Sequence, residues 1–239
     1  MTVTIEWVGL ACFRVWREGG PVIVTDPYTL QEVGLPEDGR TVDGDIVISS
    51  SLEDRAHGNP KLVRGSPRVI DALEVNVQGS GTEVDGSPVI TVGAAESADH
   101  VDAQGRFETP KDNAVYALKV GDLWILHLGD LGYGLTAEEL EPFVGRCDVL
   151  LAIVGQTNTI PLEDLDFLIA HLQPKWIVPM HYRLPPISGL LRPLDEFLVR
   201  RPQDPLIYPR SSQVTLPLEF PGIKYPAIIV LEPSGYQPT

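Results

Sequence analysis

Cysteine and basic side chains are scarce in this chain of 239 residues, and long apolar runs are missing. The two cysteines, Cys12 and Cys147, are too few and too far apart for a disulfide framework or a thiolate metal motif, and they fit a reducing cytoplasm. No apolar run approaches the roughly 20 residues that cross a bilayer. Residues 1–10 lack the basic and apolar segments of a secretory signal peptide, so we expect a cytoplasmic protein.

Positive charge is also in short supply, because 18 basic residues stand against 33 acidic ones and give a formal net charge of −15. Such a surface repels nucleic-acid phosphates and anionic lipid, so we expect neither nucleic acid nor a membrane as partner. Solubility is the simplest explanation of the acidity. The expected partner is a small molecule that the sequence does not identify, and the oligomeric state stays open.

Hydrophobic residues make up 43% of the chain, which is enough for a substantial core. A strand-rich first half is followed by alternating strands and helices, so we expect one α/β domain over residues 1–239 with two sheets covered by helices. Strands are expected at 4–16, 22–27, 45–50, 67–77, 81–86, 88–95, 113–130 (two, around a turn at 121–122), 147–155, 175–182, 213–219 and 226–232. Helices are expected at 136–145, 161–174 and 190–201, and Thr136 and Glu139 have the spacing of a capping box at the start of the first. The core is expected to include Trp7, Phe13, Leu150, Ile153, Ile177 and Val178.

Four polar residues follow the C-terminal ends of expected strands. His57 comes after 45–50, His100 after 88–95, Asp130 after the strand that ends at 129, and His181 after the strand that ends at 180. Loops at that edge of an α/β fold converge while the strands hold them rigid. Imidazole and carboxylate groups at converging positions are the usual ligands of zinc, iron or manganese.

A structural role is the alternative for each histidine. His171 lies near the C-terminus of an expected helix, where the macrodipole favours a cation, so we expect a structural role there. His127 is at an inward strand position beside Trp124 and Leu126, which favours a core role or a role in orienting a ligand.

Several phrases of the sequence resemble the metallo-β-lactamase fold family, over about residues 4–200. They are WVGLACFRV, VIVTDPY, WILHLGDLG, CDVLLAIVG and LQPKWIVPMHY. The resemblance is closest to small bacterial Zn-dependent hydrolases, a branch that includes the ascorbate-6-phosphate lactonases. It implies a four-layer αββα sandwich, in which two mixed β-sheets are flanked by helices and the metal site lies at their shared edge.

The turn after residue 50 stands where that family has H-x-H-x-D-H, and here the motif is altered. Matching backward from LVRGSPRVI puts Leu52 and Asp54 at the first two histidines, Ala56 at the aspartate and His57 at the last histidine. Matching forward from Asp45 shifts the register by one residue and leaves mostly serine and acid. We prefer the backward register, because it keeps two residues that can bind a metal. A further departure is Leu10, where the family has a histidine.

The resemblance implies that the family's later metal ligands are retained in this chain, as His100, Asp130 and His181. With His57, the last two can supply three ligands to one metal, and Asp54 or His100 can complete the set. We therefore expect weakly held zinc (or manganese or iron), mononuclear at most, or no metal at all. Arg55 could hold an anion in place of a metal charge, although a solvated loop arginine is the simpler interpretation.

Two functions fit these residues. One is a metal-dependent hydrolase of small esters, lactones or phosphoesters, with weak or no turnover because apolar residues replace polar ones at Leu10, Leu52 and Ala56. The other is a non-catalytic binding or assembly module on the same fold, since a fold alone does not decide function. Catalytic residues are not identified by the sequence.

Overall fold

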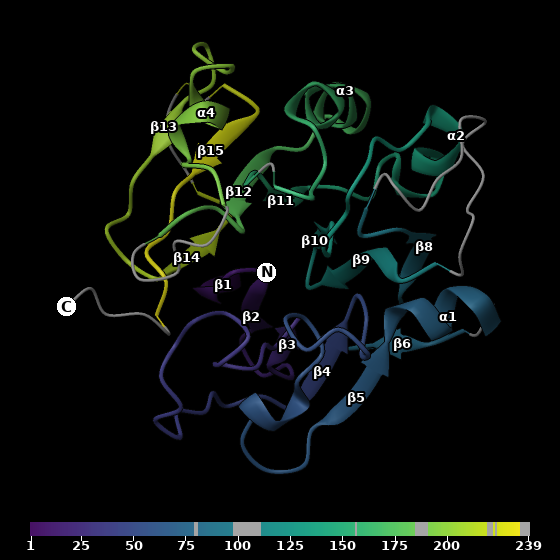
Figure 1. Ribbon diagram of the computed structural model, residues 1–239. Helices are drawn as coiled ribbons and strands as arrows, with labels where there is room; N and C mark the ends of the chain where they lie inside the picture. Colours follow the sequence, from purple (N-terminus) through teal and green to yellow (C-terminus); the bar gives the residue numbers. More distant parts are fainter. Residues whose placement is uncertain are drawn as a thin grey trace.

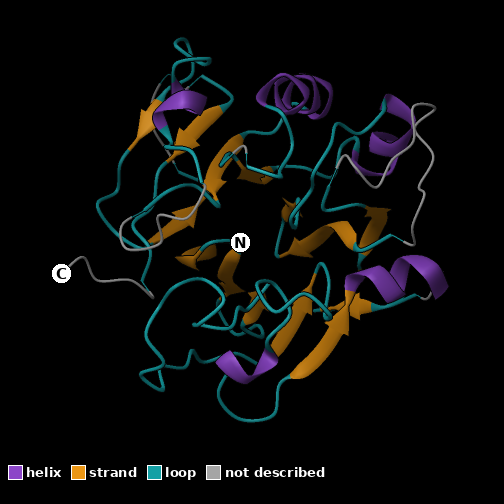
Figure 2. Cartoon of the chain, viewed as in Figure 1, coloured by secondary structure: helices purple, strands orange, loops and turns teal. Residues whose placement is uncertain are grey.

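Two mixed β-sheets lie face to face at the centre of the computed structural model, with helices on the outside (Figures 1 and 2). The structure describes residues 1–78, 81–97, 111–155, 157–184, 191–218, 222 and 224–234. The expected αββα arrangement of two mixed sheets and flanking helices is confirmed.

The first sheet has the strand order β14-β1-β2-β3-β4-β5. Its antiparallel part pairs β14 with β1, β1 with β2 and β2 with β3, and its parallel part pairs β3 with β4 and β4 with β5. These strands are β1 (Val3–Gly9), β2 (Cys12–Arg17), β3 (Ile23–Thr25), β4 (Ile46–Ser49), β5 (Arg68–Asp71) and β14 (Gln213–Leu216).

The second sheet has the strand order β13-β15-β12-β11-β10-β9-β8. Strands β10, β11, β12 and β15 run parallel to one another, so their C-terminal ends share one edge. The strands are β8 (Ile90–Ala94), β9 (Asn113–Val120), β10 (Leu123–His127), β11 (Val149–Ile153), β12 (Trp176–Met180), β13 (Leu206–Ile207) and β15 (Ala227–Ile229). A separate small hairpin pairs β6 (Glu83–Val84) with β7 (Ser87–Pro88).

Helices α2, α3 and α4 cover the second sheet, whereas α1 packs against β8 and β9 of that sheet and β5 of the first (Figure 1). The helices are α1 (Ala72–Gln78), α2 (Ala137–Leu140), α3 (Leu162–Leu172) and α4 (Asp195–Leu198), with the 3₁₀ turns η1 (Pro60–Leu62) and η3 (Glu141–Phe143). In the described parts of the chain, no helix has the length and apolar character that crossing a membrane requires.

Alternation along the strands divides the apolar residues between two cores. Ile23 and Ile48 face the main core between the sheets, while Val24 and Val47 face a second core on the outer side of the first sheet. The loop between β3 and β4 and the turn η1 cover this second core instead of a long helix. All six residues predicted for the core are buried.

The capping box expected at Thr136 and Glu139 is confirmed at the start of α2. The Thr136 hydroxyl accepts from the backbone N–H of Glu139, and the Glu139 carboxylate accepts from the backbone N–H of Thr136. Two other expectations are wrong. The run 67–77 is β5 followed by α1, since the Asp71 carboxylate accepts hydrogen bonds from the backbone N–H groups that open the helix. The run 4–16 is two strands, because the backbone turns at Leu10, whose φ is 49°.

Candidate metal centre

His57, Asp130 and His181 come together at the shared edge of the two sheets. Each offers one ligand atom, and these three atoms all lie within 4.8 Å of one another. His57 belongs to the turn after β4 of the first sheet, whereas Asp130 and His181 follow β10 and β12 of the second. The side chains therefore converge from strand ends, as the strand pattern predicts.

The backbone at His181 is held in an unusual conformation. Its φ is 56°, in the left-handed region that non-glycine residues rarely adopt, and its N–H donates to the carbonyl of Leu10 at 3.2 Å. A Cβ at Gly155 would lie 2.1 Å from the carbonyl oxygen of His181, so only glycine fits beside it. The turns at Leu10 and at Gly155 therefore fix the backbone of His181, and with it the position from which the imidazole side chain extends.

Asp130 is positioned by the tight turn that precedes it. Gly129 has a φ of 61°, and a Cβ there would lie 2.2 Å from Oδ1 of Asn113. That same amide oxygen accepts a hydrogen bond of 3.0 Å from the backbone N–H of Asp130. The carboxylate is therefore anchored through β9, the strand on which Asn113 lies.

Asp54 holds the ring of His57. The His57 Nδ1–H donates a short hydrogen bond to Oδ2 of Asp54, whose other oxygen accepts the backbone N–H of Ala56 at 2.9 Å. His57 is only 1% exposed. A histidine that donates one ring N–H to a carboxylate presents its other nitrogen as a ligand, which is the common arrangement around protein-bound metals.

Charges in the cluster shift the pKa values of both histidines. Burial alone would lower the pKa of His57, but the charge of Asp130 and the hydrogen bond to Asp54 outweigh it and raise that pKa to about 10. Burial lowers the pKa of His181, although Asp130 opposes this. Burial and the nearby charges of Asp54 and Asp130 raise the pKa of Glu96 to about 8.

The cluster has the donor set and the unsatisfied atoms that a metal requires. Nε2 of His57, Oδ1 of Asp130 and Nδ1 of His181 are buried and have no hydrogen-bond partner within the described ranges. Buried polar atoms without a partner are costly, so such a group indicates a missing ligand or ion. Two imidazoles and one carboxylate suit zinc and leave one coordination position open.

Residues 4–181 match the family described as Beta-lactamase superfamily domain. The chain belongs to this superfamily. A UPF0173 metal-dependent hydrolase of Pyrococcus horikoshii is 26% identical over 206 residues, which cover 78% of this chain and 88% of that relative. Another UPF0173 metal-dependent hydrolase, from Methanosphaera stadtmanae, is 22% identical over 239 residues and covers 92% of this chain and 98% of the relative.

Solved structures of the superfamily share this fold. A proposed Zn-dependent hydrolase of the metallo-β-lactamase superfamily from Thermotoga maritima has 30% identity and a TM-score of 0.64, and the match covers 96% of this chain and 98% of that one. The metallo hydrolase Igni18 of Ignicoccus hospitalis has a TM-score of 0.60 at 19% identity, over 92% of this chain and 100% of its own. That second likeness supports the fold only.

Not all of the residues considered from the sequence join this group. His57, Asp130 and His181 converge, and Asp54 contacts the group through the ring of His57. His100 lies outside the described residues. Arg55 is an exposed loop residue that pairs with Glu32 at 3.1 Å, in agreement with the simpler interpretation of it.

The remaining core histidine, His127, has both ring nitrogens occupied. Its Nε2–H donates to the carbonyl of Ala11 at 2.8 Å, and its Nδ1 accepts from the N–H of Gly129 at 2.9 Å. Burial lowers its pKa, so the ring is neutral. His127 therefore braces the turn before Asp130 instead of offering a free ligand atom.

Sequence reasoning did not identify the supporting residues. The carbonyl of Leu10 and the glycine at 155 act through the backbone, and Asn113 acts through its side-chain amide from a distant strand, so no local motif reveals them. Asp54 could have been found as an orienting residue, because an acid three residues before a histidine can reach its ring in a tight turn.

Proposed function

We propose that this chain is a metal-dependent hydrolase whose site holds one zinc ion on His57, Asp130 and His181. The observation that carries the proposal is the convergence of His57, which is buried, with the half-buried Asp130 and His181. Each of the three has a buried atom without a hydrogen-bond partner in the described chain. The metal-dependent hydrolases among its relatives support the same chemistry. Zinc is favoured by the two imidazole donors, with manganese and iron as the alternatives.

The chain's own residues would set up this site before any substrate arrives. Asp54 orients His57, the Asn113 amide holds the backbone of Asp130, and the carbonyl of Leu10 holds that of His181. A zinc ion bound there supplies Lewis acidity and lowers the pKa of a coordinated water. His100 stays a proposed additional ligand.

Turnover of small esters, lactones and phosphoesters is proposed to be weak or absent. In the backward register preferred from the sequence, Ala56 stands where the family motif has the aspartate that orients the attacking water. An alanine neither orients a water nor accepts its proton. The proposed setting is the cytoplasm, without nucleic acid or membrane as partner.

A non-catalytic binding module is the second candidate, and one observation favours it. Leu10 is buried in the outer apolar core, and Ala56 packs against the same core. Two positions at which the family resemblance expects polar chemistry are therefore used for packing.

Metal content tests the proposed site. Protein purified without added metal or chelator is expected to hold at most one zinc per chain by elemental analysis, and His181→Ala should remove it. His171→Ala is the matched control, because His171 lies on α3 outside the cluster and should leave the zinc content unchanged. Two metal ions per chain would contradict the mononuclear proposal.

Activity assays separate the two candidates. We expect slow or undetectable hydrolysis of simple esters, lactones and phosphodiesters by the zinc-loaded protein. A slow rate that His181→Ala abolishes supports the hydrolase, and no rate beside full zinc content supports the binding module. Rapid hydrolysis abolished by the same change would show that Ala56 does not weaken the site.

A further inference from the structure

A cavity of about 880 Å³ opens beside the metal centre. Its walls come from the turn after β4, the start of α1, the end of β8 and the residues just before β9. Asp54, which holds the ring of His57, lines this cavity. A molecule bound in it would therefore lie next to Asp54, the residue that contacts His57 of the converging group.

The lining of the cavity carries charge almost entirely of one sign. Among the described residues of that lining, Lys111 is the single basic one. The acidic residues are Glu53, Asp54, Asp71, Glu74, Glu96 and Asp112. Like charges crowded around a concave wall focus a negative potential into it.

Two basic residues that the structure describes near this lining already have partners. The ammonium group of Lys111 donates to the carbonyl of Gly93 at 2.8 Å, so it is drawn toward the edge of the second sheet. Arg55, in the adjoining turn, pairs with Glu32 at 3.1 Å, and neither residue lines the cavity.

Two of the acids are exposed at the cavity and form no ion pair with any basic residue that the structure describes. These are Glu53 and Glu74. Burial and then the charges of Glu74 and Glu53 raise the pKa of Asp71, which lines the same cavity. The three carboxylates therefore repel one another unless a cation joins them.

The size and the apolar part of the lining indicate a molecule instead of a bare ion. Leu52 and Leu73 contribute apolar walls that no metal ion uses. The volume lies in the range of about 300–1,000 Å³ that is typical of small-molecule sites. A short alkyl chain with a positive end would match both surfaces.

We propose that this cavity binds a small organic cation, an alkylammonium whose chain lies on Leu52 and Leu73 and whose charge faces Glu53 and Glu74. Where the ligand is a substrate, this inference rests on the proposed hydrolase function, and the bond to be cleaved lies toward Asp54. Anionic esters and phosphoesters are then disfavoured.

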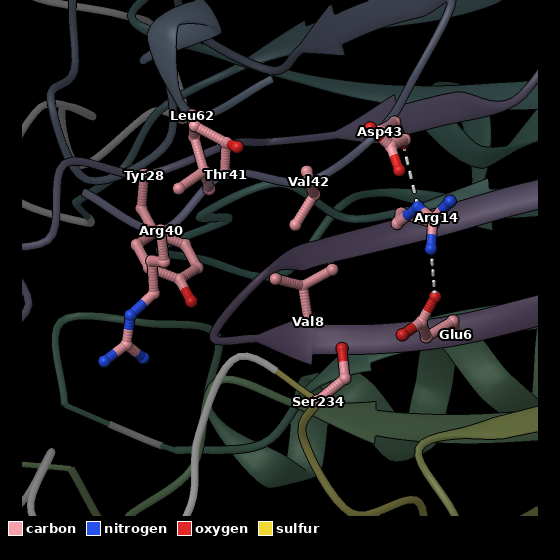
Figure 3. A pocket seen from close by; sticks show the side chains of 10 residues that line it. All are labelled: Glu6, Val8, Arg14, Tyr28, Arg40, Thr41, Val42, Asp43, Leu62 and Ser234. Atoms are coloured by element: carbon pink, nitrogen blue, oxygen red, sulfur yellow. Dashed lines mark hydrogen bonds and ion pairs between the residues drawn. The ribbon is translucent and has the colours of Figure 1, made fainter. Parts of the chain in front are cut away.

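A second cavity offers a contrast. It has a volume of about 480 Å³ and lies against β1 and β2, and its charged groups already have partners (Figure 3). Arg14 donates to Glu6 at 2.6 Å and to the carbonyl of Asp43 at 2.9 Å. Arg40 pairs with Asp38. That cavity presents a neutralised wall, whereas the one beside the metal centre does not.

The binding test uses three probes of one chain length: hexylammonium, hexanol and hexanoate. Chemical-shift changes in isotope-labelled, zinc-loaded protein should map hexylammonium to Leu52, Leu73 and Glu74, with a Kd below that of hexanol. Hexanoate should cause no change there. Because the measurement needs no turnover, it stands even if the hydrolase proposal fails.

Paired variants test the charge. Replacing Glu53 and Glu74 together by glutamine is expected to weaken hexylammonium binding about fivefold and to leave hexanol binding unchanged. Replacing Glu18 and Glu141 by glutamine is the control, because it removes the same net charge from exposed positions outside the cavity lining. If both double variants weakened hexylammonium binding equally, the loss would be due to net charge alone and the proposal would be overturned.

The hydrolysis arm compares p-nitrophenyl esters of aminocaproate, caproate and adipate, which carry a positive, a neutral and a negative end. If turnover occurs, kcat/KM for the cationic ester should exceed that for the anionic one about tenfold or more, and high salt should reduce the ratio. Turnover without this preference would refute the inference but leave the hydrolase intact. A second zinc equivalent that binds in the cavity, with no response to hexylammonium, would assign it to a metal ion and refute the inference too.

Discussion

At the scale of single residues, the carboxylate of Asp54 decides how His57 faces the cluster. Asp54→Ala removes the acceptor of the His57 Nδ1–H, and we expect zinc affinity to fall about 10–100-fold, as for other partners of ligating histidines. Asp54→Asn should lose less, because an amide oxygen can still accept that hydrogen bond. Competition with a chelating dye measures the affinity.

Glu53→Ala is the control for that change, since Glu53 is exposed and one residue away. Its zinc affinity should stay close to that of the unmodified protein. An equal loss in Glu53→Ala would mean that local negative charge, and not the orientation of His57, governs binding.

Gly155 supports His181 by leaving space for its backbone carbonyl. In Gly155→Ala the new Cβ would lie 2.1 Å from the carbonyl oxygen of His181, so the backbone must shift. We expect a loss of about 1–3 kcal/mol in the free energy of unfolding, with weaker zinc binding, by denaturant titration and elemental analysis. Gly81→Ala has nothing within 4 Å of its Cβ and should be neutral.

The sequence indicated that these three side chains would converge because they follow buried strands. His57, Asp130 and His181 could be nominated from that position alone, since parallel strands end at one edge. The left-handed backbone conformation of His181 could not be predicted from the sequence, because it depends on the carbonyl of Leu10, which is far away in the chain.

At the scale of elements, a buried hydrogen bond joins the two sheets. Asp26, just after β3, accepts from the hydroxyl of Tyr116 on β9 at 3.0 Å and from the N–H and hydroxyl of Ser50 at 2.9 and 2.6 Å. Asp26 and Tyr116 are fully buried. This contact fixes β3 and the turn that leads to His57 against the second sheet.

Tyr116→Phe removes that donor, together with the hydroxyl's hydrogen bond to the side chain of Thr25, and keeps the ring. We expect the free energy of unfolding to fall by about 1–3 kcal/mol, because a buried acceptor loses a partner. Tyr208→Phe, at an exposed tyrosine, is the matched control and should change stability little. No difference between the two variants in urea unfolding would show that Ser50 alone satisfies Asp26.

The helices and strands were predictable where one sequence pattern was clear. The spacing of Thr136 and Glu139 predicted the start of α2, and the apolar run 147–155 predicted β11. The helix α1 was not predicted, because its valines favour a strand by local propensity. The side chain of Asp71 and packing against β8 override that preference.

At the scale of the whole molecule, the candidate site joins the two sheets. His57 comes from the first sheet and the other two side chains from the second, so a metal that binds all three links both layers of the core. The cavity beside it draws on four separate segments, which explains why its charge could not be recognised along the sequence.

A ligand that binds only the folded chain stabilises all of it. With free zinc at about 100 times its Kd, the free energy of unfolding should rise by about 2.7 kcal/mol, which corresponds to a Tm increase of about 5–10 °C for a chain of this size. Magnesium should give no such shift, since the cluster offers two imidazoles that suit zinc better. Differential scanning calorimetry of His57→Ala should show the zinc response lost, and that of His171→Ala should show it kept. A zinc response that survives in His57→Ala would place the bound ion elsewhere and separate the stability of the fold from this cluster.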